Sequence, residues 1–178
     1  MPNYAIVIHE SEIPGIIQRL AHEIGDKYAG KDITLVGILK GAAYFIVFLS
    51  QAIWRDGRVK TCRIDFMCYE SYGDGQEAGK LRLVFDTSQP MTGRDVIITE
   101  DVSDTKNTLH AAYRHIGISN PKSLAICAFL SKPEKDQHKD VPLDFVGREV
   151  PKDYFLVGFG LDDKGAERNN PNVVRIIQ

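Results

Sequence analysis

The chain has 178 residues, of which 43% are hydrophobic and 26% are charged, and its formal net charge is −2. These values are ordinary for a globular protein, and the length suits one domain with a sizeable core. The slightly acidic balance argues against a nucleic-acid-binding surface, which is normally basic, and we expect no nucleic-acid partner. No apolar run approaches the roughly 20 residues of a membrane span, and the N-terminal residues lack a signal-peptide pattern, so we expect no membrane association.

Strand-like and helix-like patterns alternate along the chain. Residues 33–39 form a continuous apolar run, which is typical of a parallel strand buried on both faces. Residues 10–28 carry apolar side chains at helical spacing, and Ser11 supports a helix start there. The alternation predicts right-handed crossovers and a mostly parallel sheet. Further strands are expected at 63–69, 81–85, 96–99 and 122–130, further helices at 43–54 and 105–116, and short apolar segments at 4–8, 145–147, 155–158 and 173–177.

Two segments have the composition of loops. Residues 70–80 include Gly73, Gly75 and Gly79 and almost no apolar side chains, so we expect a long mobile loop. Loops of this length inside a compact domain often act as lids. Residues 133–142 are rich in charge, and we expect them on the surface.

The segment from Val96 to Leu109 is the most informative part of the chain. A β-branched strand core precedes Glu100 and Asp101, and a polar loop and a helix start come after them. Backbone N–H groups at a helix start can hold a phosphate, and the two carboxylates can accept hydrogen bonds from sugar hydroxyls. The segment therefore predicts a site for a phosphorylated pentose. The small polar residues suited to the loop and to helix capping are Asp104, Thr105, Asn107 and Thr108.

A second turn follows another expected strand, at Leu39-Lys40-Gly41. Its backbone N–H groups can face an anion, and Gly41 permits close approach. Ligands of parallel sheets bind beyond the carboxyl ends of the strands. Both this turn and residues 100–108 are therefore expected at the edge of the sheet where ligands bind.

The order of residues between Val96 and Thr108 resembles the phosphoribosyl-diphosphate (PRPP) signature of type I phosphoribosyltransferases. That family usually has Gly where this chain has Lys106, and an apolar residue is common at the position of Ser103. Lys106 is therefore a candidate for a positive φ, and its ammonium could reach the phosphate. Four more segments extend the resemblance over nearly the whole chain, specifically to hypoxanthine-guanine phosphoribosyltransferases. They are Leu39-Lys40-Gly41, Glu70-Ser71-Tyr72-Gly73, Leu130-Ser131-Lys132-Pro133 and the run from Asp144 to Arg168.

The resemblance implies an α/β protein with the type I phosphoribosyltransferase fold. Helices would flank a central, mostly parallel sheet, and the N-terminal segment and roughly residues 133–178 would form a small hood on a single domain spanning 1–178. The implied reaction moves 5-phosphoribose from PRPP to hypoxanthine or guanine, and it releases pyrophosphate and a purine nucleoside monophosphate. Mg²⁺ is the implied cofactor, and a homodimer or homotetramer is usual in the family.

The same resemblance assigns roles to individual residues. Asp104 is the expected general base or proton relay at the purine imidazole ring. It implies that the 5-phosphate and the ribose are bound by Glu100, Asp101, Asp104, Thr105, Lys106, Asn107 and Thr108. Pyrophosphate would be bound by Leu39, Lys40, Gly41 and Arg168, and a cis Leu39–Lys40 peptide is common in the family. The purine would be bound by Lys132, Phe155, Leu156 and Asp162, and the metal by Asp162, Glu100 and Asp101. The resemblance places Ser71 and Tyr72 in the lid. The chain departs from the family's common aromatic residues at Arg148 and Asp163.

Other interpretations stay open at this point. The protein could be a regulatory RNA-binding member of the superfamily, an enzyme that prefers xanthine, or a flavodoxin-like receiver domain. Phe155 could simply be a core residue. The three cysteines, Cys62, Cys68 and Cys127, form no CxxC pair, and free thiols in a reducing cytoplasm are the simplest explanation.

Overall fold

The computed structural model describes residues 3–72 and 80–177, and it contains two sheets and three α-helices in that part of the chain. The larger sheet has six strands in the order β4-β3-β2-β5-β6-β7. All of its neighbouring strands are parallel except β3 and β4, which are antiparallel. The strands are β2 (Asp32–Leu39), β3 (Thr61–Tyr72), β4 (Lys80–Phe85), β5 (Asp95–Ser103), β6 (Ser123–Ser131) and β7 (Phe145–Glu149).

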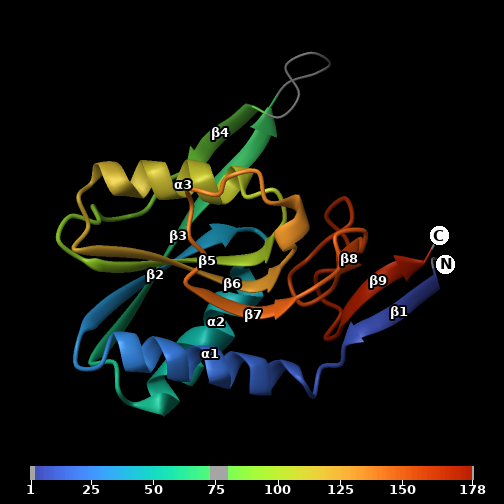
Figure 1. Ribbon diagram of the computed structural model, residues 1–178, viewed down its shortest axis with the longest axis horizontal. Helices are drawn as coiled ribbons and strands as arrows, with labels where there is room; N and C mark the ends of the chain where they lie inside the picture. Colours follow the sequence, from blue (N-terminus) through green and yellow to red (C-terminus); the bar gives the residue numbers. More distant parts are fainter. Residues whose placement is uncertain (1–2, 73–79, 178) are drawn as a thin grey trace.

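Helices cover both faces of this sheet (Figure 1). The helices α1 (Ile13–Lys27) and α2 (Ala43–Asp56) lie on one face, and α3 (Asn107–Ile118) lies on the other. The predicted α/β class with a central, mostly parallel sheet is therefore confirmed. None of the helices in residues 3–72 and 80–177 is long and apolar enough to cross a membrane.

Each face of the sheet packs its own hydrophobic cluster. Successive side chains of a strand point to opposite faces, and on β2 Leu35 joins the cluster beside α1 and α2 while Val36 joins the one beside α3. Leu20 and Phe45 are fully buried in the first cluster, and Leu109 is buried in the second. The double burial of β2 agrees with the prediction made from its unbroken apolar run.

The smaller sheet joins the two ends of the described chain. Its strands are β1 (Asn3–Ile8), β9 (Val173–Ile177) and β8 (Leu156–Val157), and β1 and β8 flank β9 in antiparallel pairing. In Figure 1 this sheet lies at one end of the molecule with both termini. Of the region expected to form a hood, residues 145–149 belong instead to the larger sheet as β7.

Several element boundaries differ from those expected. Helix α1 begins at Ile13 rather than near Ser11, whose hydroxyl lies 2.9 Å from His9 Nδ1 instead of capping the helix. The predicted loop at 70–80 is shorter, because β3 continues to Tyr72 and β4 begins at Lys80. The rest of that predicted loop, residues 73–79, lies outside the described residues.

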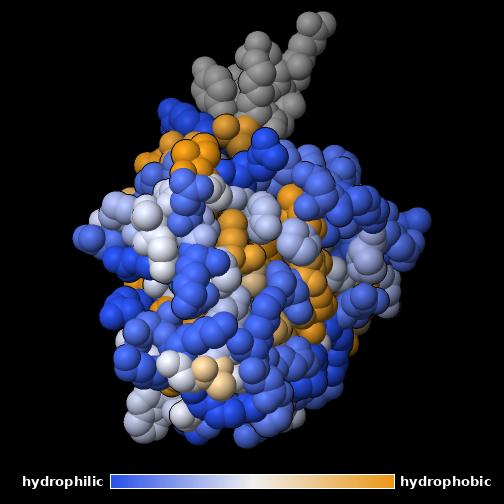
Figure 2. Space-filling model, turned by 60° about the vertical axis from the view of Figure 1, so that its left-hand side comes forward, coloured by the Kyte–Doolittle hydropathy of each residue, from blue (hydrophilic) through white to orange (hydrophobic). Residues whose placement is uncertain are grey.

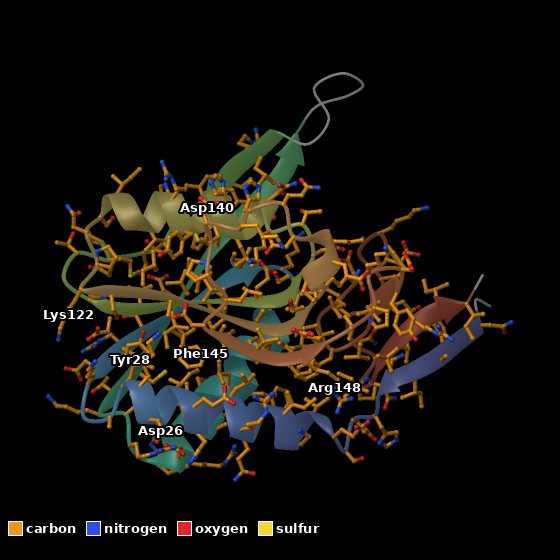
Figure 3. The ribbon with its side chains drawn as sticks, viewed as in Figure 1. Asp26, Tyr28, Lys122, Asp140, Phe145 and Arg148 are labelled. Atoms are coloured by element: carbon orange, nitrogen blue, oxygen red, sulfur yellow. The ribbon has the colours of Figure 1, made fainter. Side chains whose placement is uncertain are left out.

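Surface side chains connect the layers as well. Arg148 on β7 donates from Nη2 to Glu12 Oε2 at 3.1 Å, which joins the edge of the large sheet to the start of α1 (Figure 3). Figure 2 shows a mostly hydrophilic face with apolar side chains gathered near the projecting β3–β4 pair. The exposed large apolar residues of that pair are Ile64, Val84 and Phe85.

A glycine on β7 tests how closely the edge strand packs. A Cβ atom at Gly147 would overlap the backbone carbonyl of Phe129 and crowd the side chain of Ile16. We expect Gly147→Ala to lower the free energy of unfolding by about 1–3 kcal/mol, as overpacking of a core usually does. Urea unfolding followed by circular dichroism measures it.

The matched control is Gly15→Ala in α1, where a Cβ would meet nothing within 4 Å. Alanine should raise stability there by about 0.5–1 kcal/mol, because glycine is unfavourable inside a helix. Equal effects of the two substitutions would show that β7 does not pack as described.

Candidate active site

Three segments from distant parts of the chain meet at the carboxyl ends of β2 and β5. A Cβ atom at Gly41 would overlap the carboxylate of Asp101, and one at Gly160 would overlap the backbone carbonyl of Gly41. The peptide bond between Leu39 and Lys40 is cis, as the resemblance implied, and Lys40 is exposed. The turn after β2 and the end of β5 thus lie together, as expected from strand-end placement.

Glu100 and Asp101 form a buried carboxylate pair. The strand β5 runs on to Ser103, so the two acids lie within the strand rather than after it, and each is only 8% exposed. Burial raises the pKa of Glu100 well above its ordinary value, and the adjacent Asp101 carboxylate adds to this rise. Burial also raises the pKa of Asp101, against the lowering effect of hydrogen bonds from Glu100 and from the Val102 N–H, 2.8 Å away, and of the Arg168 charge. Burial therefore disfavours the charged form of both acids, and more strongly at Glu100.

The polar loop between β5 and α3 surrounds a small cavity. The cavity has a volume of about 100 Å³ and is lined by residues 100 and 102–109. Helix α3 begins at Asn107, two residues later than predicted, and the side chain of Lys106 before it does not cap it. Lys106 holds the preceding position with φ of 64°, the left-handed conformation expected where the family has Gly. The start of α3 leaves backbone N–H groups free to face an anion.

The ammonium of Lys106 contacts residues 136 and 141, which do not line this cavity. Its Nζ lies 2.7 Å from Asp136 Oδ2 and donates to the Val141 carbonyl at 2.9 Å; Lys106 is buried, and the Asp136 side chain is 10% exposed. Burial acts to raise the pKa of Asp136, but the hydrogen bond from Lys106 and that from the His138 N–H outweigh it and hold this pKa below its ordinary value. The expected contact between the Lys106 ammonium and a phosphate is thus replaced here by an ion pair, because a buried carboxylate lies within its reach.

Asp104 lies among lysines. Lys132, which is buried, donates to Asp104 Oδ2 at 3.0 Å, and Lys135 donates to the same oxygen at 3.1 Å. The other oxygen, Oδ1, is shielded from solvent, and in the described part of the chain no group donates to it with hydrogen-bond geometry. Lys132, expected at the purine, and Asp104, the expected base, are therefore neighbours.

The loop after β8 brings the remaining predicted residues to the same end of the sheet. Arg168 Nη2 lies 2.7 Å from Asp162 Oδ1, and Nη1 of the same guanidinium donates to the Gly160 carbonyl. Asp162 Oδ2 accepts a hydrogen bond from the Gly165 N–H at 2.6 Å. The pair brings Asp162 and Arg168, six positions apart in the sequence, together beside Gly160, which lies against Gly41.

Phe155 is 54% exposed, so the alternative that it is a core residue is wrong. The next residue, Leu156, is buried in β8. The backbone of Ser71 and Tyr72 forms the end of β3, and their side chains lie outside the described part of the molecule.

Sequence reasoning missed some residues of this region. Nothing in the sequence marks Asp136 or Lys135 within a charged surface segment, since their importance comes from where the chain returns to the loop. Gly160 was not singled out either, although the pair Gly158 and Gly160 could have indicated a close backbone approach.

Comparison with known proteins gives a consistent result. Residues 8–164 match the family model described as "Phosphoribosyl transferase domain". The hypoxanthine phosphoribosyltransferase of Salmonella typhimurium is 35% identical over 175 residues, covering 97% of this chain and 94% of that protein. The hypoxanthine-guanine phosphoribosyltransferase of Mycobacterium tuberculosis is 36% identical over 165 residues, covering 89% and 78%.

Solved structures agree with this. A hypoxanthine-guanine phosphoribosyltransferase of Bacillus anthracis superposes with a TM-score of 0.88 at 31% identity, covering 99% of this chain and all (100%) of that one. A hypoxanthine phosphoribosyl transferase of Trypanosoma cruzi superposes with a TM-score of 0.87 at 29% identity, covering 97% and 91%.

The Lys106–Asp136 pair gives a test of how the loop is held. Removing one partner of a buried ion pair leaves the other charge uncompensated, so Lys106→Met should lower the free energy of unfolding by about 3 kcal/mol at neutral pH. Because the pKa of Asp136 is depressed in the folded state, the pair stabilises the protein above the ordinary aspartate pKa and loses its effect as the pH falls through the folded-state value. Chemical unfolding at pH 7 and in acid measures the loss of stability in Lys106→Met and its dependence on pH.

The matched control is Lys139→Met. Lys139 Nζ also approaches Asp136 Oδ2, at 3.4 Å, but its side chain is 76% exposed. Loss of such a partner should change stability by less than about 1 kcal/mol. If the two methionine variants behave alike, Lys106 does not hold the loop.

For the pair of Glu100 and Asp101, the predicted effect of pH on stability has the opposite sign to that of Asp136. A carboxyl whose pKa is raised by folding makes the protein less stable as the pH rises from the unfolded-state value through the folded-state value. Glu100→Gln removes this penalty and should raise stability by roughly 0.5–2 kcal/mol, the usual scale when a strained functional site is relieved. The gain should be larger at pH 8 than at pH 5 in urea unfolding.

Glu149→Gln, at the exposed end of β7, serves as its control and should leave stability nearly unchanged at both pH values. A Glu100→Gln variant that is no more stable at pH 8 than the parent would mean that burying the pair carries no penalty.

Proposed function

Because the chain belongs to the phosphoribosyl transferase domain family, we propose that it transfers 5-phosphoribose from PRPP to a 6-oxopurine in purine salvage. The proposed base is hypoxanthine, guanine or both, and the products are the purine nucleoside monophosphate and pyrophosphate. One observation carries the proposal, namely that a cavity at the start of α3 adjoins a buried carboxylate pair. The cavity suits the 5-phosphate, and Glu100 and Asp101 suit the hydroxyls of the ribose attached to it.

The diphosphate of PRPP is assigned to the turn after β2. Lys40, Gly41 and Arg168 supply backbone and guanidinium donors there, and Arg suits bidentate contacts with phosphate. Gly41 lies against Asp101, and Gly160 against Gly41, so the turn is held where the sugar's leaving group would be.

Mg²⁺ is the proposed cofactor. The donor set fits a hard cation, because Glu100, Asp101 and Asp162 offer only carboxylate oxygens. The buried pair fits as well, since burial and, after it, the neighbouring Asp101 charge raise the pKa of Glu100, and a divalent ion would favour the charged form of both acids. When bound, Mg²⁺ supplies positive charge that stabilises the diphosphate leaving group.

The purine is assigned to the side of the site formed by β6 and the loop before β8. The exposed ring of Phe155 can stack on the base, with the backbone near Leu156 at its edge. Lys132 has only hydrogen-bond donors, so it favours a 6-oxo group over the 6-amino group of adenine. To reach the base, Lys132 exchanges its present partner, Asp104, for the purine oxygen.

The reaction then needs a proton acceptor and an oriented pair of substrates. The bond from the sugar to pyrophosphate breaks as a purine nitrogen bonds to the sugar carbon, and Asp104 accepts or relays the proton from the imidazole ring. Orientation of both substrates and charge stabilisation at the leaving group supply most of the remaining acceleration. Ser71 and Tyr72 are proposed to belong to the segment that shields the reacting centre from water.

The remaining proposals concern the domain organisation, the oligomeric state and the location of the protein. We propose a single catalytic domain, a homodimer or homotetramer, and a cytoplasmic location, in keeping with three free cysteines. The RNA-binding alternative gains no support, since the relatives named above are transferases and the chain is slightly acidic. A flavodoxin-like receiver domain is excluded by membership of the phosphoribosyl transferase domain family.

A panel assay tests the proposed activity. With PRPP and Mg²⁺, we expect nucleotide formation from hypoxanthine or guanine and none above background from adenine or uracil. Chromatography of the products measures this directly. Turnover of xanthine alone would keep the reaction class but reject the proposed bases, and no turnover with any base would reject the enzyme.

Asp104→Asn tests the base. Turnover should fall by about 10²–10⁴-fold, the usual contribution of a positioned base, while PRPP binding measured by calorimetry stays within a few-fold. Glu134→Gln, an exposed acid nearby that pairs with Lys152 at 3.4 Å, is the control and should leave turnover unchanged. Unchanged turnover in the Asp104 variant would remove this residue from the mechanism.

A further inference from the structure

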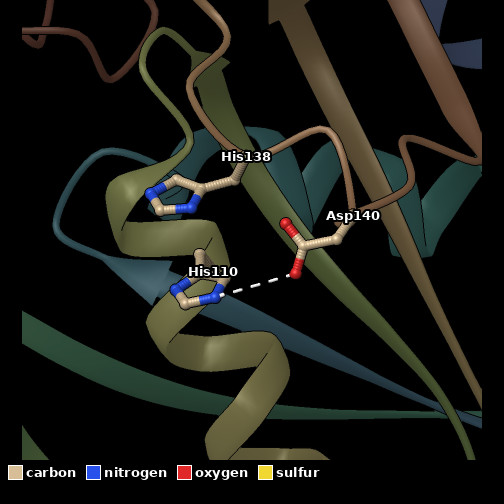
Figure 4. A group of neighbouring side chains, drawn as sticks. All are labelled: His110, His138 and Asp140. Carbon is tan, nitrogen blue, oxygen red and sulfur yellow. Dashed lines mark ion pairs between the residues drawn. The ribbon is translucent and has the colours of Figure 1, made fainter.

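Two histidines and an aspartate meet on the outer side of α3, away from the groups assigned to the reaction. The residues are His110 on α3 and His138 and Asp140 in the segment after β6 (Figure 4). One potential ligand atom from each lies within 4.8 Å of the others. We propose that these three side chains form a site for a transition-metal ion of the Zn²⁺ type.

The hydrogen bonds of His138 leave its inner nitrogen free for a metal. His138 Nε2 lies 2.8 Å from the side-chain oxygen of Asn107, so Nε2 donates and Nδ1 carries the lone pair. In Figure 4 the other ring nitrogen, next to Cβ, lies on the side of His110 and Asp140. A second nitrogen that donates to a carbonyl oxygen is the usual way in which proteins orient a metal-binding histidine.

The potential ligand atoms lie close together, but farther apart than in an occupied metal site. His110 Nε2 lies 3.9 Å from Asp140 Oδ2, and the rings of His110 and His138 stack with centroids 4.2 Å apart. In a tetrahedral zinc site with bonds of about 2.0 Å, ligand atoms are separated by about 3.3 Å. Binding therefore requires the His110 ring to rotate out of its stack with His138, which Asn107 holds, and the ligand atoms to close by up to about 1.5 Å, given the present separations. Asp140 is 65% exposed, and its side chain has room to follow.

The backbone on both sides of the site is already held. The His138 N–H donates to Asp136 Oδ1 at 2.9 Å, and the Gln137 N–H donates to the Thr105 carbonyl at 3.2 Å. Together with the bond from Lys106 to the Val141 carbonyl, these contacts fix the segment against the start of α3. Only side-chain rotation is needed for the ligands to converge.

The donor set selects the class of ion. Two neutral imidazoles and one carboxylate are typical of Zn²⁺ sites that keep a fourth position for water. Mg²⁺ and Ca²⁺ prefer oxygen ligands, so neither competes well for this site. An ion here would join α3 to residues 136–141, which flank the loop at 104–108, without contacting the cavity that this loop surrounds.

Zinc titration of the chelator-treated full chain, without PRPP or Mg²⁺, tests the site. Calorimetry should detect one saturable Zn²⁺ per chain. His110→Ala and His138→Ala should each weaken binding at least about tenfold, as loss of a ligand does. Co²⁺ in place of Zn²⁺ should give the visible absorption of a tetrahedral ion in the parent and lose it in both variants.

His115→Ala is the matched control, because His115 also lies on α3 but pairs with Asp86 at 2.8 Å. It should bind Zn²⁺ as the parent does. Zn²⁺ should also raise the melting temperature of the parent and not that of the double variant H110A/H138A. Absence of saturable binding in the parent, or binding of equal strength in the folded double variant, would overturn the proposal whatever the enzyme's activity.

Discussion

The site depends on keeping two adjacent carboxylates out of water at the end of β5. Neighbouring acids that are each 8% exposed cannot both ionise without a penalty, and the pKa of Glu100 rises accordingly. The fold tolerates the penalty of burying these acids because Gly41 lets the turn after β2 pack directly against Asp101 and because Arg168 contributes opposite charge. A sugar diol and a divalent cation are ligands that turn such a pair into a binding site.

Next to this pair, the loop at residues 104–108 is held by a segment far along the chain. Lys106 adopts the left-handed conformation that usually favours glycine. Its ion pair with Asp136 offsets the free-energy cost of this backbone conformation. Residues 132–141 return along the loop and contact Asp104, Thr105 and Lys106 by ion pairs and a backbone hydrogen bond. Loop and segment therefore form one polar unit, in which the proposed base and its neighbouring lysine are positioned together.

Much of this could be predicted from the sequence, and the exceptions have physical causes. The buried strand at 33–39 and the helix after Gly41 follow from local patterns, and both are confirmed. The positive φ at Lys106 was suggested by the family resemblance, and the structure has it. Helix starts at Ser11 and Thr105 were placed too early, because polar residues there bond locally instead of capping. The Lys106–Asp136 pair is a tertiary contact across 30 positions, and no local pattern encodes it.

We propose that the buried acids at the end of β5 are held ready for the sugar and its cation. Carbon-13 NMR of labelled Glu100 and Asp101 carboxyl groups, followed through a pH titration, can show whether this is so. We predict that in the free protein one of the two titrates above the ordinary carboxyl range, and that PRPP with Mg²⁺ lowers this pKa. Ordinary titration of both groups, unaffected by PRPP and Mg²⁺, would show that the pair does not hold the sugar and its cation.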